Sequence, residues 1–422
     1  MIIIHGMNDM PSVIPRHLTR AVARALDAFP VVILTGARQT GKSTLIRELL
    51  PASSRDYRTL DDIDVLDLAE REPEALLEGT RPITIDEIQR SPKLLLAIKR
   101  SVDRARQPGR FLLSGSANLA LLGTVSDTLA GRAVYLTLYP FTAGEQARLG
   151  TVGAWERVLT DPSQFHGIHA PVSDAAQRVL QSGFPPTVLN GEAGVQRAWL
   201  DGYVRTYLER DLQALSTIEN LIDFRRLMRV AALRSGALVN QTEMARDVGL
   251  SQPTVHRYLN LLEASYLFHR LPAYAVNRTK RLIKTPRLFF CDSGLAAFLA
   301  GVNSEAELEK AGLRGPLLET LVFGDLLAWR ETVTPRPDVS YWRTASGAEV
   351  DFVIEQGGTV VPIEIKSTAR PQSGDIAHLR LFLDEYKKAT PHGILIHTGP
   401  RAERLADRIW AIPLSVALGL SR

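Results

Sequence analysis

The run VVILTGARQTGKS occupies residues 31–43 and decides the fold of the first part of the chain. Its first half, Val31 to Thr35, is a short β-branched stretch typical of a buried strand. The glycine-rich turn that follows matches the pattern G-x-x-x-x-G-K-[ST], and Lys42 to Leu50 then has helical spacing. Because a strand leads through this turn into a helix, we expect a phosphate-binding loop here.

The turn is suited to hold the phosphates of ATP or ADP. Glycines let backbone N–H groups curl around phosphate oxygens, and the helix N-terminus adds partial positive charge. Lys42 is expected to reach the β- and γ-phosphates, and Ser43 to offer its hydroxyl to Mg²⁺. A glycine-rich turn without a ligand is the alternative. The expected nucleotide-binding residues are Gly36, Ala37, Arg38, Gln39, Thr40, Gly41, Lys42, Ser43 and Thr44.

A second apolar run ends in two carboxylates, in the order Ile83-Thr84-Ile85-Asp86-Glu87. This is a Walker B pattern, in which Asp86 holds Mg²⁺ through water and Glu87 orients and deprotonates the attacking water. A helix N-cap is the alternative for an isolated Asp-Glu pair. The phosphate loop upstream favours ATP hydrolysis.

Two further positions are weaker candidates for the same reaction. The run Phe111 to Ser114 leads into a polar strand end, where Ser116 is preferred over Asn118 as a sensor of the γ-phosphate. Arg132 is a candidate to reach a phosphate in its own chain or in a neighbouring subunit. Turn capping and a surface ion pair are the alternatives.

Length and composition indicate a cytoplasmic protein of two or three domains. The chain has 422 residues, of which 45% are hydrophobic, and its single cysteine excludes an internal disulfide framework. No signal-like segment or membrane-length apolar run is present, so we expect no membrane association. Short buried strands separated by helices predict a parallel α/β sheet.

We expect four segments. They are a P-loop ATPase domain at 1–149, a linker rich in Gly, Pro, Ser and His at 150–172, a helical domain at 173–304 and an α/β domain at 305–422.

The helical domain contains a candidate winged helix at about 236–287. Gln241 to Val248 and Gln252 to Glu263 have helical spacing and are separated by the turn Gly249-Leu250-Ser251, while Leu271 to Arg287 is a candidate basic wing. DNA is one expected partner, since residues 201–290 hold 14 Lys/Arg against eight Asp/Glu. Docking of a protein partner is the alternative. The candidate DNA contacts are Gln252, Thr254, His256, Arg257 and Asn260.

The C-terminal segment contains a predicted hairpin, residues 349–366, with Gly357 and Gly358 as its loop. This register places Asp351 opposite Glu364 and Glu349 opposite Lys366. Strict alternation assigns the acids and Lys366 to one face, and the core face receives Val350, Phe352, Ile354, Ile363 and Ile365. Facing carboxylates need a cation or a raised pKa, so a second Mg²⁺ or Mn²⁺ is a candidate ligand of Asp351 and Glu364. Lys366 is then placed to orient water or stabilise developing charge.

Two family resemblances follow from these motifs. The runs at 34–44 and 85–89, Ser114-Gly115-Ser116 and Gly131-Arg132 resemble bacterial and archaeal AAA+ ATPases with a C-terminal domain of unknown function 4143. The resemblance extends through 203–212, 292–295 and 342–367, and it implies nucleotide binding and hydrolysis, with ring-like homo-oligomers common among AAA+ proteins.

The spacing of Asp351, Glu364 and Lys366 resembles the PD-(D/E)xK nuclease superfamily, with Glu319 as a further acid and Val350 in place of the usual proline. This resemblance implies a restriction-endonuclease-like αβββαβ core at 305–422. The resulting hypothesis is an ATPase that couples nucleotide turnover to engagement, with or without cleavage, of DNA. The alternative is a nucleotide-dependent switch that binds a protein and carries an inactive nuclease fold.

Overall fold

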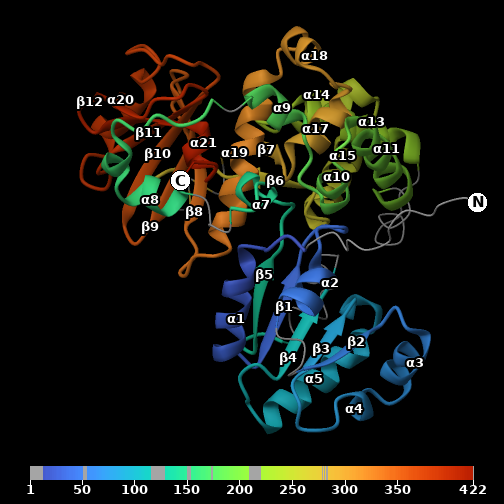
Figure 1. Cartoon of the computed structure of the whole chain (residues 1–422). Coiled ribbons are helices and arrows are strands. Elements are labelled where there is room, and N and C mark those ends of the chain that lie inside the picture. Colours follow the sequence, from blue (N-terminus) through green and yellow to red (C-terminus); the bar gives the residue numbers. More distant parts are fainter. Residues whose placement is uncertain are drawn as a thin grey trace, which may run out of the picture.

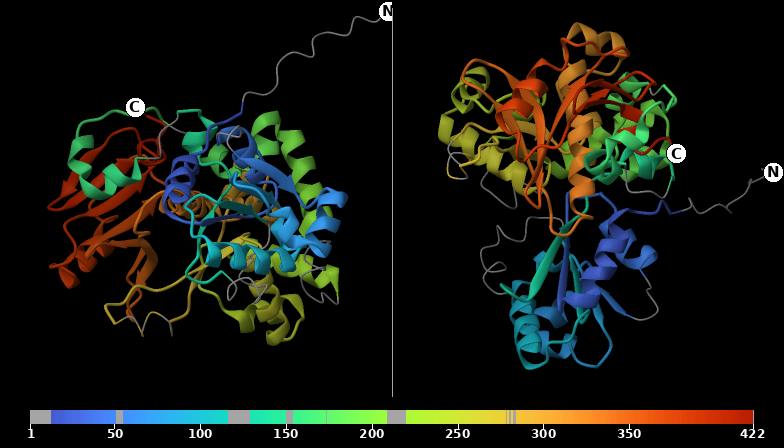
Figure 2. Two further views of the ribbon diagram at one scale, coloured as in Figure 1. Left: turned by 90° about the horizontal axis from the view of Figure 1, so that it is seen from below. Right: turned by 90° about the vertical axis from the view of Figure 1, so that its left-hand side faces the viewer.

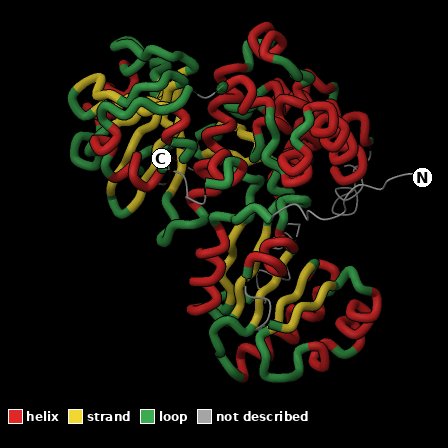
Figure 3. Tube along the Cα trace, in the orientation of Figure 1, coloured by secondary structure: helices red, strands yellow, loops and turns green. Residues whose placement is uncertain are grey.

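A computed structural model describes residues 13–50, 55–115, 129–149, 154–172, 174–208, 220–277, 279, 281 and 284–421. Figure 1 shows two bodies, with the N-terminal sheet and its helices below and the remaining chain above. The right-hand view in Figure 2 separates the same two bodies. In Figure 3, helices flank the strands of the lower body, and the upper body divides into a helix-rich half and a sheet-rich half.

The lower body contains the expected parallel sheet. Its strand order is β2-β3-β4-β1-β5, and every neighbouring pair is parallel. Val31 and Ile33 of β1 pack on one face, whereas Val32 and Leu34 pack on the other, which explains the uninterrupted apolar run. The strands are β1 (Val31–Thr35), β2 (Asp56–Thr59), β3 (Ile83–Asp86), β4 (Phe111–Ser114) and β5 (Ala133–Thr137); the helices include α1 (Leu18–Ala28), α2 (Lys42–Thr44), α3 (Ile63–Arg71), α4 (Pro73–Leu76) and α5 (Pro92–Arg104).

The helix-rich half contains the two helices expected around the turn at 249–251. Gly249 ends the first helix with φ 72°, and the Ser251 hydroxyl caps the second by accepting from Thr254 N at 3.3 Å. A two-stranded antiparallel sheet of β6 (Phe268–Leu271) and β7 (Arg287–Phe290) follows. The helices include α9 (Ala175–Leu180), α10 (Pro185–Asn190), α11 (Ala193–Gly202), α13 (Leu221–Leu233), α14 (Gln241–Val248), α15 (Gln252–Ala264), α17 (Ser293–Ala300) and α18 (Glu305–Lys310).

The sheet-rich half is a mixed six-stranded sheet in the order β12-β13-β11-β10-β9-β8. The hairpin register is confirmed from the loop, where Thr359 pairs with Gln356 and both glycines have positive φ, as far as the pair of Ile363 and Phe352. The pairing of Asp351 with Glu364 and of Glu349 with Lys366 stays a prediction. The strands are β8 (Asp338–Arg343), β9 (Glu349–Gln356), β10 (Thr359–Lys366), β11 (Gly393–His397), β12 (Glu403–Ala406) and β13 (Ile409–Pro413); the helices are α19 (Arg314–Arg330), α20 (Ala377–Glu385) and α21 (Leu414–Ala417).

The prediction of strict alternation along β9 is wrong at one position. Val350 packs with Val353 in the core beneath α20, whereas Phe352 packs in the core shared with α19. The pairing of β8 with β9 shifts register between Ser340 and Trp342, as a β-bulge does. The bulge changes the side-chain alternation, so Val350 does not share a face with Phe352.

The segment expected to be a linker is a packed part of the upper body. Within the described residues 154–172, α8 (Trp155–Thr160) and a 3₁₀ turn (Pro162–Phe165) bury Trp155, Val158 and Phe165. Backbone bonds from Gly167 N to Ala402 O at 3.0 Å and Ala170 N to Pro400 O at 2.7 Å attach it beside β12. The glycines and prolines of this segment led to the prediction of a flexible linker. The segment is packed instead, because the large apolar side chains between them are buried in the core of the upper body.

None of the helices in the described ranges has the combined length and apolar character that a bilayer span requires. Cytoplasmic localisation stays a prediction.

Candidate functional site

The glycine-rich turn lies at the carboxyl end of β1, the sheet edge that faces the upper body (Figure 1). Gly36 has φ 141°, and a Cβ there would lie 2.3 Å from the carbonyl oxygen of Leu138. Gly41 has φ 93° and begins α2. Any larger side chain at Gly36 would therefore displace the loop or β5's continuation, so glycine is required by close approach as well as by its backbone angles.

Lys42 is buried beneath this turn. Its Nζ donates to the carbonyl oxygens of Gly36 at 3.0 Å and Ala37 at 2.8 Å. Burial lowers the pKa of Lys42 to about 8, although the charges of Glu87 and Asp86 act in the opposite direction. Phosphate oxygens at the turn would supply the missing negative charge and favour the ammonium form.

Asp86 ends β3, and both oxygens of its carboxylate accept hydrogen bonds. Its Oδ1 accepts from the Ser114 hydroxyl and from Glu87 N at 3.1 Å, and its Oδ2 accepts from the Tyr57 hydroxyl at 2.9 Å. Burial raises the pKa of Tyr57, and the adjacent Asp86 charge adds to that rise. Ser114 and Tyr57 therefore set the orientation of this carboxylate, and neither residue is predicted for that role from the sequence.

Glu87 follows in a left-handed conformation, with φ 56°. Such a conformation is uncommon for a residue other than glycine and is a frequent mark of functional sites. Its carboxylate accepts a hydrogen bond from the Gln89 side chain. It lines a pocket of ≈ 290 Å³ together with Arg38, Asp61, Gln89 and Arg90. The structure thus brings a phosphate-loop residue and the expected base to one hollow.

Arg16 supports the turn from behind and was not anticipated from the sequence. Its guanidinium donates to Thr40 O at 2.7 Å and Tyr139 O at 2.6 Å, and it pairs with Glu145 at 3.1 Å. Both side chains of the ion pair are nearly fully buried. Since it precedes α1 and bonds to residues 24 and more positions away, no local motif could have identified it.

Two candidates of the sequence analysis are placed elsewhere. Arg132 lies just before β5, at the amino end of a strand parallel to β1, and therefore at the sheet edge opposite the phosphate loop. There it pairs with Asp103 through two bonds of 2.6 and 3.0 Å. Arg132 therefore forms the surface ion pair that was the alternative prediction. Its contact with a phosphate in a neighbouring subunit stays a prediction. Ser116 and Asn118 lie outside the described residues.

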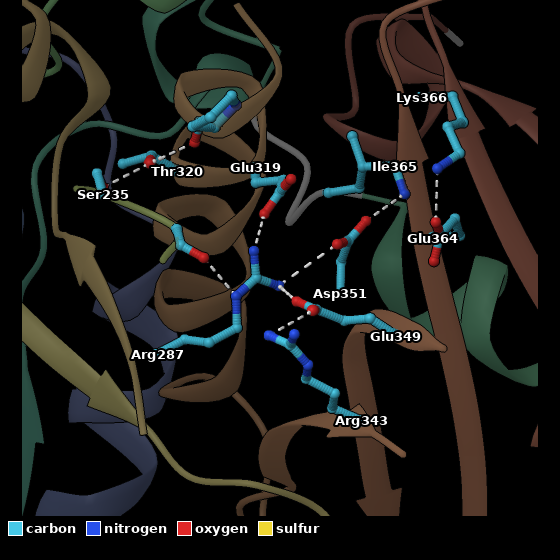
Figure 4. Close-up of polar contacts among 12 residues, drawn as sticks. Ser235, Arg287, Glu319, Thr320, Arg343, Glu349, Asp351, Glu364, Ile365 and Lys366 are labelled. Atoms are coloured by element: carbon cyan, nitrogen blue, oxygen red, sulfur yellow. Dashed lines mark hydrogen bonds and ion pairs between the residues drawn. The ribbon is translucent and has the colours of Figure 1, made fainter. Parts of the chain in front are cut away.

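The second group of candidates converges in the upper body (Figure 4). Glu319 comes from α19, Asp351 from β9, and Glu364 and Lys366 from β10. Lys366 Nζ lies 2.7 Å from Glu364 Oε1, and Asp351 Oδ2 accepts from Ile365 N at 2.8 Å. Lys366 thus contacts Glu364, and Asp351 contacts the backbone between them, while a shared catalytic role for these residues and Glu319 stays a prediction.

The positive charge next to these carboxylates belongs to Arg287, the last residue of the predicted wing. Arg287 pairs with Glu319, with Glu349 at 3.2 Å and with Asp351 at 3.4 Å. Among the described residues, no group of three or more His, Cys, Asp or Glu side chains is arranged to hold a metal ion. The expectation of a second metal at Asp351 and Glu364 is thus unsupported, because the Arg287 guanidinium contacts Asp351 and the Lys366 ammonium contacts Glu364.

Family profiles match three segments of the chain. An AAA domain covers residues 28–147, a domain of unknown function (DUF8612) covers 172–306, and another (DUF4143) covers 314–417. An uncharacterized protein of Mycobacterium tuberculosis is 33% identical over 403 residues, which are 94% of this chain and 83% of that protein. An uncharacterized protein of Haemophilus influenzae is 22% identical over 383 residues, which are 85% and 88% of the two chains.

Solved structures show only distant likeness. The Walker-type ATPase PABY2304 of Pyrococcus abyssi has a TM-score of 0.43 and 17% identity, covering 68% of this chain and 96% of its own. RuvB of Thermotoga maritima has a TM-score of 0.29 and 18% identity, covering 60% and 89%.

The AAA profile spans the phosphate loop and Asp86, and the mycobacterial match spans nearly the whole chain. The chain accordingly belongs to the family of AAA-domain ATPases with a C-terminal DUF4143 domain, which it shares with the Mycobacterium tuberculosis protein.

Proposed function

We propose that the chain hydrolyses ATP and that the reaction changes how the upper body holds DNA. The observation that carries the proposal is the convergence of the phosphate loop, Lys42, Asp86 and Glu87 at one sheet edge. Lys42 would neutralise the β- and γ-phosphates, Ser43 and, through water, Asp86 would hold Mg²⁺, and Glu87 would take a proton from the attacking water. Mg²⁺ supplies charge stabilisation on the phosphate oxygens.

The nucleotide site has direct contacts with the upper body. The Tyr203 hydroxyl donates to Arg38 O at 3.3 Å, which is a carbonyl of the phosphate loop itself. Burial raises the pKa of Tyr266, and its hydrogen bond with the Thr35 side chain opposes that rise. Tyr203 continues from α11, and Tyr266 lies between α15 and β6. A change in the loop on nucleotide binding therefore reaches the helical half through two hydroxyl groups.

The face proposed to contact DNA is the exposed side of α15. Gln252, His256 and Asn260 are exposed on this helix, while Val255 and Leu259 are buried beneath them. The helix pair α14–α15 followed by the β6–β7 sheet is the element order of a winged helix. We assign DNA to this surface because amide and imidazole side chains on a second helix suit base edges and phosphates.

A second candidate function is a nucleotide-dependent switch that holds a protein partner. Arg287 favours it, since a nuclease reaction needs a metal where the guanidinium contacts Asp351. On this proposal the C-terminal domain has a nuclease-like fold, supported by the order α19, β8, β9, β10, α20 and β11, but does not cleave. Metal-assisted cleavage by Glu319, Asp351, Glu364 and Lys366 would require Arg287 to leave.

The test compares ATP turnover by the wild type and Glu87→Gln, each with and without double-stranded and single-stranded DNA. Glu78→Gln is the matched control, because Glu78 is an exposed carboxylate on the same domain. DNA-stimulated turnover that is lost only in Glu87→Gln supports the proposal. Turnover that ignores every nucleic acid contradicts its DNA half and favours the protein-binding switch, and turnover that survives Glu87→Gln contradicts the assigned base.

A further inference from the structure

A cavity of ≈ 760 Å³ lies between the ATPase domain and the helix-rich half. One wall comes from α7 (Ala143–Gln146), within the segment matched by the AAA profile. The other walls come from α9, α10, α11 and α17, within the segment matched by DUF8612, and Figure 1 shows these four helices grouped together. The cavity therefore has the size of a small-molecule site and the position between domains where such sites are common.

Hydrogen bonds and close packing hold the cavity walls in place. The Gln196 side chain of α11 donates to Leu180 O at 2.9 Å and accepts from Ser182 N at 3.3 Å, which ties α11 to the end of α9. The Thr187 hydroxyl of α10 donates to Ser182 O at 2.9 Å. At Gly294 of α17 a Cβ would lie 2.3 Å from Ser182 N, so these two backbones are in direct contact. The cavity is therefore a fixed feature of the fold.

Every charged side chain among the described residues that line the cavity is a cation. They are Arg178 of α9, which is half-buried, and Arg197 of α11, which is exposed. Burial lowers the pKa of Arg178, and the charge of Asp174 opposes that change. A cleft lined by charges of one sign concentrates ligands of the opposite sign, and guanidinium groups match the oxygens of phosphates and carboxylates. The lining therefore favours an anion.

The uncharged part of the lining favours an organic molecule over an inorganic ion. Gln177 and Gln181 present exposed carboxamides, which both donate and accept hydrogen bonds. Leu200 and Phe298 supply apolar surface. An inorganic ion would leave these groups unused, whereas an anionic group on a body with hydroxyl or amide groups would contact them.

We propose that this cavity is a second ligand site, which binds a small organic anion with a phosphate or carboxylate group between the ATPase and helical domains. The inference goes beyond the proposed ATPase function and does not depend on it. The guanidinium groups of Arg178 and Arg197 bind the anionic group, and the carboxamides bind the organic body.

The cavity wall is connected to the phosphate loop. Gln146, which lines the cavity, follows Glu145 in α7. Glu145 pairs with Arg16 at 3.1 Å, and Arg16 donates to Thr40 O in the phosphate loop at 2.7 Å. An occupant of the cavity would therefore lie beside the helix whose carboxylate supports that loop.

The experiment measures binding by isothermal titration calorimetry to the full chain carrying Lys42→Ala, so that the ATP site contributes little. The probes are glucose 6-phosphate as a phosphate source and citrate as a carboxylate source, with glucose as the uncharged control. At least one anionic probe should bind, and glucose should bind at least about tenfold more weakly. Arg197→Gln should weaken binding of that probe by about tenfold. Arg205→Gln is the matched control and should leave it unchanged, because Arg205 is also exposed but does not line the cavity.

Gly194→Trp tests the location of the site. A Cβ at Gly194 would meet nothing beyond its own helix within 4 Å, so the indole can enter the cavity without displacing backbone, and binding should be lost. If this variant does not fold, Arg178→Gln/Arg197→Gln decides, because it removes both charges and leaves the space unchanged. Loss of binding in a variant that circular dichroism shows to be folded supports the proposal. Binding of neither anionic probe below about 10 mM, or binding that survives in the folded variants, overturns it.

Discussion

Replacing Arg16 with methionine should weaken nucleotide binding by the phosphate loop and lower the free energy of unfolding of the ATPase domain. Methionine keeps an unbranched apolar stem in the space over the Phe141 ring, where the guanidinium carbon lies 4.5 Å from the ring centre. It removes the donors to Thr40 O and Tyr139 O and leaves Glu145 without its buried cation. The turn then loses its contact with the rest of the domain at Thr40.

The magnitude follows from these contacts. Removing one partner of a buried ion pair costs about 3–5 kcal/mol, and each orphaned carbonyl adds about 1–3 kcal/mol. Glu145 keeps backbone donors at 2.7 Å from His17 N and 2.9 Å from Thr142 N, which moderates the loss. We therefore expect a decrease of at least about 4 kcal/mol in the free energy of unfolding, which is the middle of the range for the ion pair alone and to which the two orphaned carbonyls add.

Urea denaturation followed by circular dichroism measures the stability, and titration with a fluorescent ATP analogue measures affinity in the folded range. Arg20→Met is the matched control, because Arg20 is exposed on α1. Adding Glu145→Gln to Arg16→Met should recover part of the stability, since it removes the uncompensated charge. The reasoning is refuted if Arg16→Met unfolds at the same urea concentration as Arg20→Met and binds the analogue equally well.

Three further predictions concern other parts of the chain. Burial raises the pKa of Asp325 from 3.8 to about 7, and Trp155 Nε1 donates a hydrogen bond to this carboxyl group at 2.7 Å. The contribution of Asp325 to the free energy of unfolding is therefore full below about pH 4 and is lost as the pH rises through 7. Asp325→Asn should flatten that slope in urea titrations across pH 4–8, and an unchanged slope contradicts the assignment. Tyr57→Phe should raise the Mg²⁺ concentration for half-maximal ATP turnover by about threefold to tenfold, because a hydrogen bond that orients Asp86 is lost; a wild-type Mg²⁺ dependence argues against this role. Arg132→Ala should leave ATP affinity unchanged, since its ion pair lies at the opposite sheet edge, and weaker binding in a titration counts against the placement.

Much of the nucleotide site was predictable because its chemistry is local in the chain. Gly36 to Ser43 form one turn, and Asp86 and Glu87 end one strand, so the expected neighbours are set by a few consecutive residues. The hairpin register around Gly357 was predictable for the same reason, as a two-residue loop fixes which residues face each other. The helix pair flanking Gly249 also follows from short-range capping and periodicity.

Only the tertiary structure shows which residues far apart in the sequence contact each other. Arg16 meets Glu145 across 129 positions, and Arg287 meets Asp351 across 64, so neither partner is marked by local spacing. The bulge in β9 moved Val350 out of the face that alternation assigned to it, because the pairing with β8 imposed one extra residue. Local hydrogen bonding and periodicity act within a few residues, whereas a buried charge takes its partner from whichever element packs against it. The sequence by itself therefore determined the ATP-binding loop and the order of the elements, and only the packed chain decided that an arginine, rather than an open metal site, meets the carboxylates of the C-terminal domain.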